Sequence, residues 1–170
     1  TRQLRVYDGN LKYVDTLVSF SEIPDEISLC INISNCPNNC KGCHSSYLKG
    51  DIGEELNVES LYKLIHANAG VTCVCFMGGD QNHKLICDLA FAVHVLADKP
   101  RKVAWYSGRE TLPEDFSIGF FDYIKLGPYI EELGPLTNPN TNQRMYLTSF
   151  SQGDVERFED ITYKFWKNDK

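Results

Sequence analysis

Residues 27–44 read ISLCINISNCPNNCKGCH and combine two signals in one stretch. Apolar residues take alternate positions from Ile27 to Ile33, a pattern that predicts a strand with one buried face. Three cysteines then follow at spacings of four and three residues: Cys36, Cys40 and Cys43. The sequence therefore predicts a strand that carries a three-cysteine loop at its carboxyl end.

The cysteine loop has the composition expected around a bulky inorganic group. Pro37 cannot join a strand ladder, and Gly42 allows the chain to pass close to such a group. Cysteine thiolates hold the irons of iron–sulfur clusters, and simple carriers use one thiolate for each iron of a cubane. Three thiolates on a four-iron cubane would leave one iron open to another ligand.

Two other uses of these thiols stay open, and a third is disfavoured. A structural zinc ion requires four ligands, usually in CxxC pairs, and His44 is too close to Cys43 in sequence to complete the same tetrahedron easily. Unligated thiols are the second alternative. A disulfide framework does not fit the odd count of seven cysteines or the lack of an apolar signal core in the first five residues.

The composition predicts one globular domain over residues 1–170, of which 42% are hydrophobic. The formal net charge of -6 and the pI near 5.2 disfavour nucleic acid as a partner, because phosphate binding relies on clustered Lys and Arg. No uninterrupted apolar run approaches the ~18 residues that a membrane span needs. We therefore expect a cytoplasmic protein with no membrane partner, in a reducing compartment where thiol ligands persist.

Alternating and helical patterns predict strands and helices along the rest of the chain. The turn residues Asp8-Gly9-Asn10 predict a hairpin of Leu4–Tyr7 with Leu11–Val14. The other predicted elements are a helix at 58–69 capped by Asn57, strands at 71–77, 102–106, 123–126 and 144–148, and a helix at 85–97. Residues 134–142 (GPLTNPNTN) predict a long loop, and the tail at 154–166 fits either a helix or a strand.

Strands that alternate with helices favour a mainly parallel sheet with right-handed crossovers. A complete eight-unit barrel takes about 250 residues. At roughly 30 residues for each βα unit, this chain has room for five or six. We therefore expect an α/β fold, a partial, open TIM-like barrel of five or six βα units.

A second group of candidate residues falls at the ends of the predicted strands. Gly78, Gly79, Asp80, Ser107 and Lys125 each lie at or beside the carboxyl end of one of them. Because barrel active sites form at the carboxyl ends of strands, we expect these residues to meet the cysteine loop at one edge. The missing side chains of the two glycines would allow another group to approach their backbone closely, and Asp80 would add negative charge.

The CxxxCxxC spacing of the three cysteines resembles the cluster loop of the radical S-adenosylmethionine enzymes. The Gly-Gly-Asp motif is similar to the glycine-rich motif with which that superfamily receives the amino group of S-adenosylmethionine. The resemblance implies a [4Fe-4S] cluster on Cys36, Cys40 and Cys43. It also implies cofactor contacts from Gly42, Cys43 and His44, from Gly78, Gly79 and Asp80, from Ser107 toward the ribose, and from Lys125 toward the carboxylate.

Two segments narrow the resemblance to one branch of that superfamily. Phe121–Tyr129 (FDYIKLGPY) and Asn140–Arg144 (NTNQR) look like segments of the activating proteins of anaerobic ribonucleoside-triphosphate reductase. That family implies reductive cleavage of S-adenosylmethionine at the cluster and formation of a glycyl radical on the reductase. Reduced flavodoxin or ferredoxin would supply the electron. Members commonly have an aromatic residue beside the third cysteine, whereas Gly42 and His44 flank it here.

Three other functions remain open on the same residues. The chain could activate another glycyl radical enzyme, of the formate-lyase type, or act on a metabolite as the deazaguanine synthases do. It could also be an iron–sulfur electron-transfer module, although such a carrier would normally provide a fourth cysteine and none follows Cys87. Cys30, Cys73 and Cys75 fall within predicted strands and are interpreted as packing residues.

Overall fold

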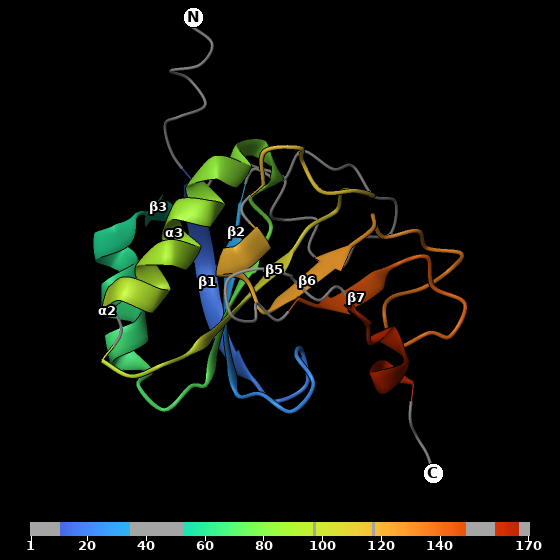
Figure 1. The fold of residues 1–170 in the computed structure, drawn as a ribbon, viewed down its shortest axis with the longest axis horizontal. Helices are drawn as coiled ribbons and strands as arrows, with labels where there is room; N and C mark the ends of the chain where they lie inside the picture. The colour runs from blue at the N-terminus through green and yellow to red at the C-terminus, as the bar shows by residue number, and fades with distance from the viewer. Residues whose placement is uncertain (1–10, 35–52, 97, 117, 149–158, 167–170) are drawn as a thin grey trace, which may run out of the picture.

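The computed structural model describes residues 11–34, 53–96, 98–116, 118–148 and 159–166, which form one sheet with α-helices on one face (Figure 1). The strand order is β3-β1-β2-β4-β5-β6-β7-β8. The strands are β1 (Leu11–Ser19), β2 (Ser28–Ile33), β3 (Glu54–Leu56), β4 (Cys73–Met77), β5 (Lys102–Tyr106), β6 (Tyr123–Leu126), β7 (Arg144–Leu147) and β8 (Glu159–Asp160). The described helices are α2 (Val58–Ala67) and α3 (His83–Leu96), with short 3-10 helices η2 (Asp80–Asn82), η3 (Ile118–Phe120) and η4 (Thr162–Phe165).

Four neighbouring strands at the centre of the sheet, β2, β4, β5 and β6, run parallel. β1 pairs antiparallel with β2, and β7 pairs antiparallel with β6. β3 and β8 extend these two flanks and are again antiparallel to their neighbours. The sheet is therefore mixed, and its parallel part is confined to the four central strands.

The expectation of a partial TIM-like barrel with five or six βα units is wrong. The structure is an eight-stranded mixed sheet, and in the described residues α-helices occur only in the connections that lead to β4 and β5. A parallel crossover needs about a dozen residues or more. The connection 20–27 is shorter, so β1 and β2 pair antiparallel. After β6, the segment 127–143 is rich in Gly, Pro and Asn and stays a loop, from which β7 returns antiparallel.

Most elements predicted from the hydrophobic pattern are present, with small shifts at their ends. β5 and β6 have the predicted bounds, and β2 and β4 begin slightly later than predicted. Asn57 caps α2 as predicted: its Oδ1 accepts from the backbone N–H of Ser60 at 2.8 Å, and its own N–H donates to Ser60 Oγ at 2.9 Å. Leu11–Tyr13 pair with β3. Leu4–Tyr7, the other strand of the predicted hairpin, lie outside the described residues, so the hairpin stays a prediction.

Two separate apolar clusters lie on the two faces of the sheet. On the helix side, α2 and α3 pack side by side over strand residues that include Phe76 and Trp105 (Figure 1). The opposite face has smaller strand residues, among them Cys30, Cys73, Cys75 and Ala104. Residues from connecting segments cover that second face: Ile23, Leu136 and Ile161. The three cysteines are buried free thiols in this cluster, as their interpretation as packing residues predicts.

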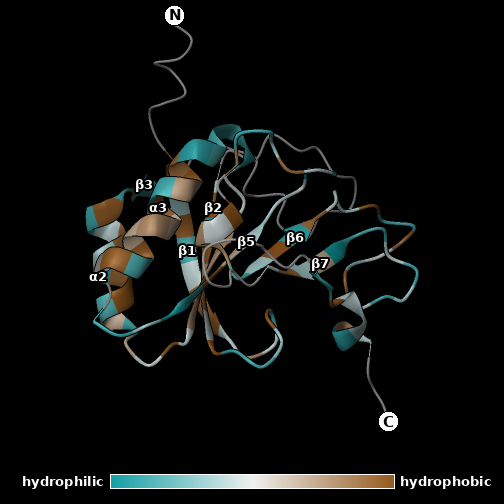
Figure 2. Cartoon of the chain, viewed as in Figure 1, coloured by the Kyte–Doolittle hydropathy of each residue, from teal (hydrophilic) through white to brown (hydrophobic). Residues whose placement is uncertain are grey.

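The outer surface of the helix layer also carries apolar side chains. Val58 and Tyr62 on α2, and Phe91 and Val95 on α3, are exposed pairs one helical turn apart. Figure 2 shows the brown, hydrophobic segments that both helices contain. Neither helix, and no other helix in the part of the chain that the structure describes, is long and apolar enough to cross a membrane.

Two tyrosines on the second face, the partly buried Tyr106 and the buried Tyr123, should make the fold sensitive to high pH. Tyr106 donates its hydroxyl to the carbonyl of Glu22, and Tyr123 donates to Glu26 Oε2 at 3.1 Å. Burial raises the pKa of both phenols, and nearby acidic groups raise these pKa values further. The folded state favours the neutral phenols. Their contribution to the free energy of unfolding is therefore complete below the ordinary tyrosine pKa of about 10 and decreases as the pH rises above it.

We expect the phenolate absorbance of these two tyrosines to appear together with loss of circular dichroism in an alkaline titration. Tyr123→Phe should move this transition to higher pH, because one phenol no longer favours the unfolded chain. Tyr163→Phe, at an exposed position, is the matched control and should leave the transition in place. An unchanged transition in Tyr123→Phe would contradict the assignment to this residue.

Candidate functional site

The carboxyl ends of β4, β5 and β6 bring the second predicted group of residues together at one edge of the sheet. Gly78, Gly79 and Asp80 follow β4, Ser107 follows β5, and Lys125 lies within β6. The backbone N–H of Ser107 donates to the carbonyl of Lys125 at 2.9 Å. The parallel pairing of these three strands is what places the five residues side by side.

Asp80 links the turn after β4 to the end of β5. Its Oδ1 accepts from the hydroxyl of Ser107 at 2.6 Å, and its Oδ2 accepts from the backbone N–H of Gly108 at 2.9 Å. Hydrogen bonds to an ionised carboxylate are among the stronger ones in proteins. The negative charge of Asp80 is therefore fixed at this edge, with both oxygens engaged by the protein.

Lys125 adds a buried positive charge next to the same serine. Its Nζ donates to the carbonyls of Ser107 and Gly127, each at 3.0 Å, and lies 5.6 Å from the ring centroid of Tyr106. The whole residue is only 8% exposed. Carbonyl dipoles and an aromatic face offset part of the cost of burying an ammonium group. Asp80 and Lys125 thus hold opposite charges on either side of Ser107.

The glycines of the turn have backbone conformations that other residues rarely adopt. Gly78 has φ of 112° and Gly79 has φ of 91°. The carbonyl of Gly78 accepts from Trp105 Nε1 at 2.7 Å, and the carbonyl of Gly79 accepts from the backbone N–H of Asn82 at 3.0 Å. These carbonyls, which the sequence suggested for an ammonium group, are therefore already hydrogen-bonded within the protein.

Gly79→Ala should lower the free energy of unfolding by about 2 kcal/mol, from backbone strain and overpacking. A Cβ at this position would lie 2.7 Å from Ile86 Cδ1 and 2.8 Å from its Cγ1. Combining Gly79→Ala with Ile86→Val, which removes Cδ1, should destabilise by less than the sum of the two single changes. Urea denaturation measures all three variants.

Gly70→Ala is the control for this series, because a Cβ there would meet nothing within 4 Å and its backbone is not left-handed. It should leave stability unchanged or raise it slightly. Strict additivity of Gly79→Ala and Ile86→Val would show that the clash with Ile86 is not the cause.

The cysteine segment follows β2 in sequence. Cys36, Cys40, Cys43, Gly42 and His44 lie outside the described residues. Ser34, the last described residue before them, donates its N–H to the carbonyl of Lys12 at 2.8 Å. Its own carbonyl accepts from Gln81 Nε2 at 3.0 Å, directly beside the Gly-Gly-Asp turn. The chain therefore enters the cysteine segment next to that turn.

The long loop between β6 and β7 borders the other side of the edge. Gln143 donates from Nε2 to the carbonyl of Gly127 at 3.3 Å, so this carbonyl is shared with Lys125. Asn142 donates from Nδ2 to the carbonyl of Pro128 at 3.0 Å. The Asn-Gln pair of the NTNQR segment thus fixes the backbone that follows β6.

Two features of this edge were missed by the sequence interpretation. His83, at the start of α3, has its Nε2 2.9 Å from Asp115 Oδ1, and this hydrogen bond is the main cause that lowers the pKa of Asp115. The two residues are 32 positions apart, so no spacing rule relates them. Gln81 is the second feature, and its position directly after the Gly-Gly-Asp motif was the available signal.

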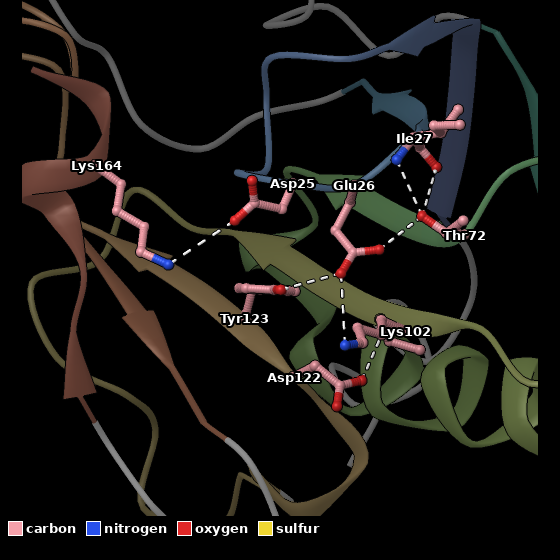
Figure 3. A network of polar contacts seen from close by, with 9 residues as sticks. Asp25, Glu26, Ile27, Thr72, Lys102, Asp122, Tyr123 and Lys164 are labelled. Carbon is pink, nitrogen blue, oxygen red and sulfur yellow. Dashed lines mark hydrogen bonds and ion pairs between the residues drawn. The ribbon is translucent and has the colours of Figure 1, made fainter. Parts of the chain in front are cut away.

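A second polar network lies at the opposite edge, where the parallel strands begin (Figure 3). Glu26 is its centre: Oε1 accepts from Thr72 Oγ1 at 2.6 Å, and Oε2 accepts from the hydroxyl of Tyr123 at 3.1 Å. Lys102 Nζ lies 3.5 Å from the same Oε2. Polar residues at the amino ends of barrel strands typically serve stability. By analogy we assign this network to the scaffold.

The first edge has charges of both signs among its described residues. A fixed carboxylate on Asp80 and a fixed ammonium on Lys125 can each attract the opposite charge of a zwitterion. Among the residues that the structure describes, no group of three or more His, Cys, Asp or Glu side chains could hold a metal ion. No family model, curated protein or solved structure matches this chain.

Proposed function

We propose that this protein is a radical S-adenosylmethionine enzyme that activates an anaerobic ribonucleoside-triphosphate reductase. Cys36, Cys40 and Cys43 would hold a [4Fe-4S] cluster, and S-adenosylmethionine would bind beside it. The bound cofactors would supply one-electron cleavage of a carbon–sulfur bond and so the means to take a hydrogen atom from a glycine of the reductase. The protein's own part is to bind, orient and shield these groups.

The observation that supports this proposal is the order of motifs along neighbouring parallel strands. The cysteine motif follows β2 in sequence, and Gly-Gly-Asp, Ser107 and Lys125 come at the ends of β4, β5 and β6. Parallel sheets bind their ligands at the carboxyl ends of the strands.

Asp80 and Lys125 would set the electrostatics around the amino-acid part of S-adenosylmethionine. The attraction acts through space and is stronger near buried groups than in bulk water. Ser107 holds Asp80 by its hydroxyl and Lys125 by its carbonyl, so neither charge needs to move when a ligand arrives. Such fixed charges avoid a reorganisation cost at the moment of reaction.

The proposal includes partners and a compartment. The substrate protein would be the glycyl radical subunit of the reductase, and reduced flavodoxin or ferredoxin would be the electron donor. Both the donor and the thiol ligands need reducing conditions, so the cytoplasm is the proposed location.

The proposal is tested by loading the protein with iron and sulfide without oxygen, then adding dithionite and S-adenosylmethionine. We expect release of 5′-deoxyadenosine and methionine, and a glycyl radical by electron paramagnetic resonance when the reductase is present. A fully loaded protein that releases neither product would be an electron-transfer module instead. Products together with a radical only on a formate-lyase-type enzyme, or only with a metabolite substrate, would assign one of the other two functions.

A further inference from the structure

One buried acceptor in the turn after β4 has no hydrogen-bond partner among the residues that the structure describes. It is Oε1 of Gln81. The same amide donates from Nε2 to the carbonyl of Ser34 at 3.0 Å. A carbonyl can only accept, so the amide nitrogen must face Ser34 and Oε1 must point elsewhere. A buried acceptor that stays unpaired is unfavourable, and such atoms in native proteins call for an explanation such as a bound ligand.

The glycine carbonyls and the carboxylate oxygens of this turn are engaged by the protein. The carbonyl of Gly78 accepts from Trp105, and the carbonyl of Gly79 accepts from Asn82. Both carboxylate oxygens of Asp80 accept from the end of β5. Gln81 Oε1 is therefore the acceptor of this turn that is best placed to receive a donor from a ligand.

The two neighbouring side chains also point to different strands. Asp80 reaches the end of β5, whereas Gln81 reaches Ser34 at the end of β2. The cysteine segment begins directly after Ser34. A ligand donor that binds Gln81 Oε1 would therefore lie on the β2 side of the turn. The charge of Asp80 would be one residue away along the chain.

We infer that Gln81 Oε1 accepts a hydrogen bond from the protonated amino group of S-adenosylmethionine, and that Asp80 acts on that group only through its charge. The inference rests on the proposed function. It replaces the expectation that the backbone carbonyls of Gly78 and Gly79 and the carboxylate of Asp80 bind the amino group directly. A primary ammonium offers the N–H donors that a lone amide oxygen requires.

The test is anaerobic calorimetric titration of the cluster-loaded protein with S-adenosylmethionine and with an analogue that lacks the α-amino group. Gln81→Met, which keeps the length of the side chain, should weaken binding of S-adenosylmethionine about tenfold, as expected for a hydrogen bond to a charged donor. Binding of the analogue should not change. Gln81→Glu keeps an acceptor and should keep the affinity for S-adenosylmethionine.

Asn142→Leu is the matched control. Asn142 also donates from its amide to a backbone carbonyl, and its buried oxygen also has no partner in the described part of the chain, but it lies in the loop after β6. Asn142→Leu should not weaken binding of S-adenosylmethionine relative to binding of the analogue. Circular dichroism checks that each variant is folded.

Three results would overturn the inference. Equal weakening of both ligands by Gln81→Met and Gln81→Glu would show that the residue only supports the backbone of Ser34. A loss confined to S-adenosylmethionine in Asn142→Leu would place the amino group elsewhere. If the unaltered, cluster-loaded protein binds neither ligand, the proposed function itself fails. The first two results would overturn only the inference about Gln81.

Discussion

Replacing Cys36, Cys40 or Cys43 with alanine should in each case abolish incorporation of the iron–sulfur cluster. Each residue would supply one of only three protein thiolates, and removing one would leave two irons of a cubane without protein ligands. Iron and sulfide content, with visible absorption spectra after anaerobic reconstitution, measures the outcome. Release of 5′-deoxyadenosine should fall to the level of the apoprotein in all three variants.

Cys73→Ala and Cys87→Ala are the matched controls and should retain their iron. Both thiols are buried, and Cys73 packs with Cys30 and Cys75 on the second face of the sheet. Burial raises the pKa of Cys73 and Cys75, which disfavours the thiolate form that binds metals. We expect Cys73→Ala to cost about 1 kcal/mol of stability, as is typical of a small core change. Loss of iron from Cys73→Ala would show that the ligand assignment is wrong.

The central strands could be predicted because their sequences are short apolar runs bounded by polar or turn residues. Cys73–Met77, Lys102–Tyr106 and Tyr123–Leu126 are buried strands of this kind. Their carboxyl ends also identified the edge where Gly-Gly-Asp, Ser107 and Lys125 meet. Local pattern was sufficient here, because burial on both faces and the turn residues after each strand act within a few positions.

The overall architecture could not be predicted from the same signals. Periodicity indicates that a segment is a strand but not the direction in which its neighbour runs. β7 was therefore counted toward a parallel barrel, although it pairs antiparallel with β6. β1 was expected in a hairpin with residues 4–7, and its antiparallel pairing with β2 was not foreseen. The connections 107–122 and 127–143 contain no α-helix in their described residues, and without helices they cannot form further βα units.

Contacts within the two polar networks depend on the register of distant strands. Glu26 meets Thr72 and Tyr123 across 46 and 97 positions, and Gln81 meets Ser34 across 47. No pattern in a single sequence encodes such pairs. The motif residues were accessible to sequence reasoning. The partners that hold them, and the lack of a partner for Gln81 Oε1 among the described residues, required the structure.

Glu26→Ala should lower the free energy of unfolding by about 2–3 kcal/mol, because it removes the hydrogen bonds of Thr72 and Tyr123 to a largely buried carboxylate, while Lys102 is half exposed. The Glu26 side chain is only 9% exposed and joins residues of three strands or their flanks: Thr72, Lys102 and Tyr123 (Figure 3). Glu26→Gln keeps the shape and one acceptor, so its effect should be smaller. Urea denaturation measures both variants.

Asp25→Asn is the control, and it tests whether losing any carboxylate at this edge is sufficient to destabilise the fold. The Asp25 side chain is 85% exposed, and its Oδ2 lies 3.9 Å from Lys164 Nζ, so we expect a change within about 0.5 kcal/mol. Asparagine also tolerates the positive φ of 70° at this position. Equal effects of Asp25→Asn and Glu26→Ala would contradict a buried network centred on Glu26. Folded Glu26→Gln should still cleave S-adenosylmethionine, because the network lies at the edge opposite Asp80 and Lys125.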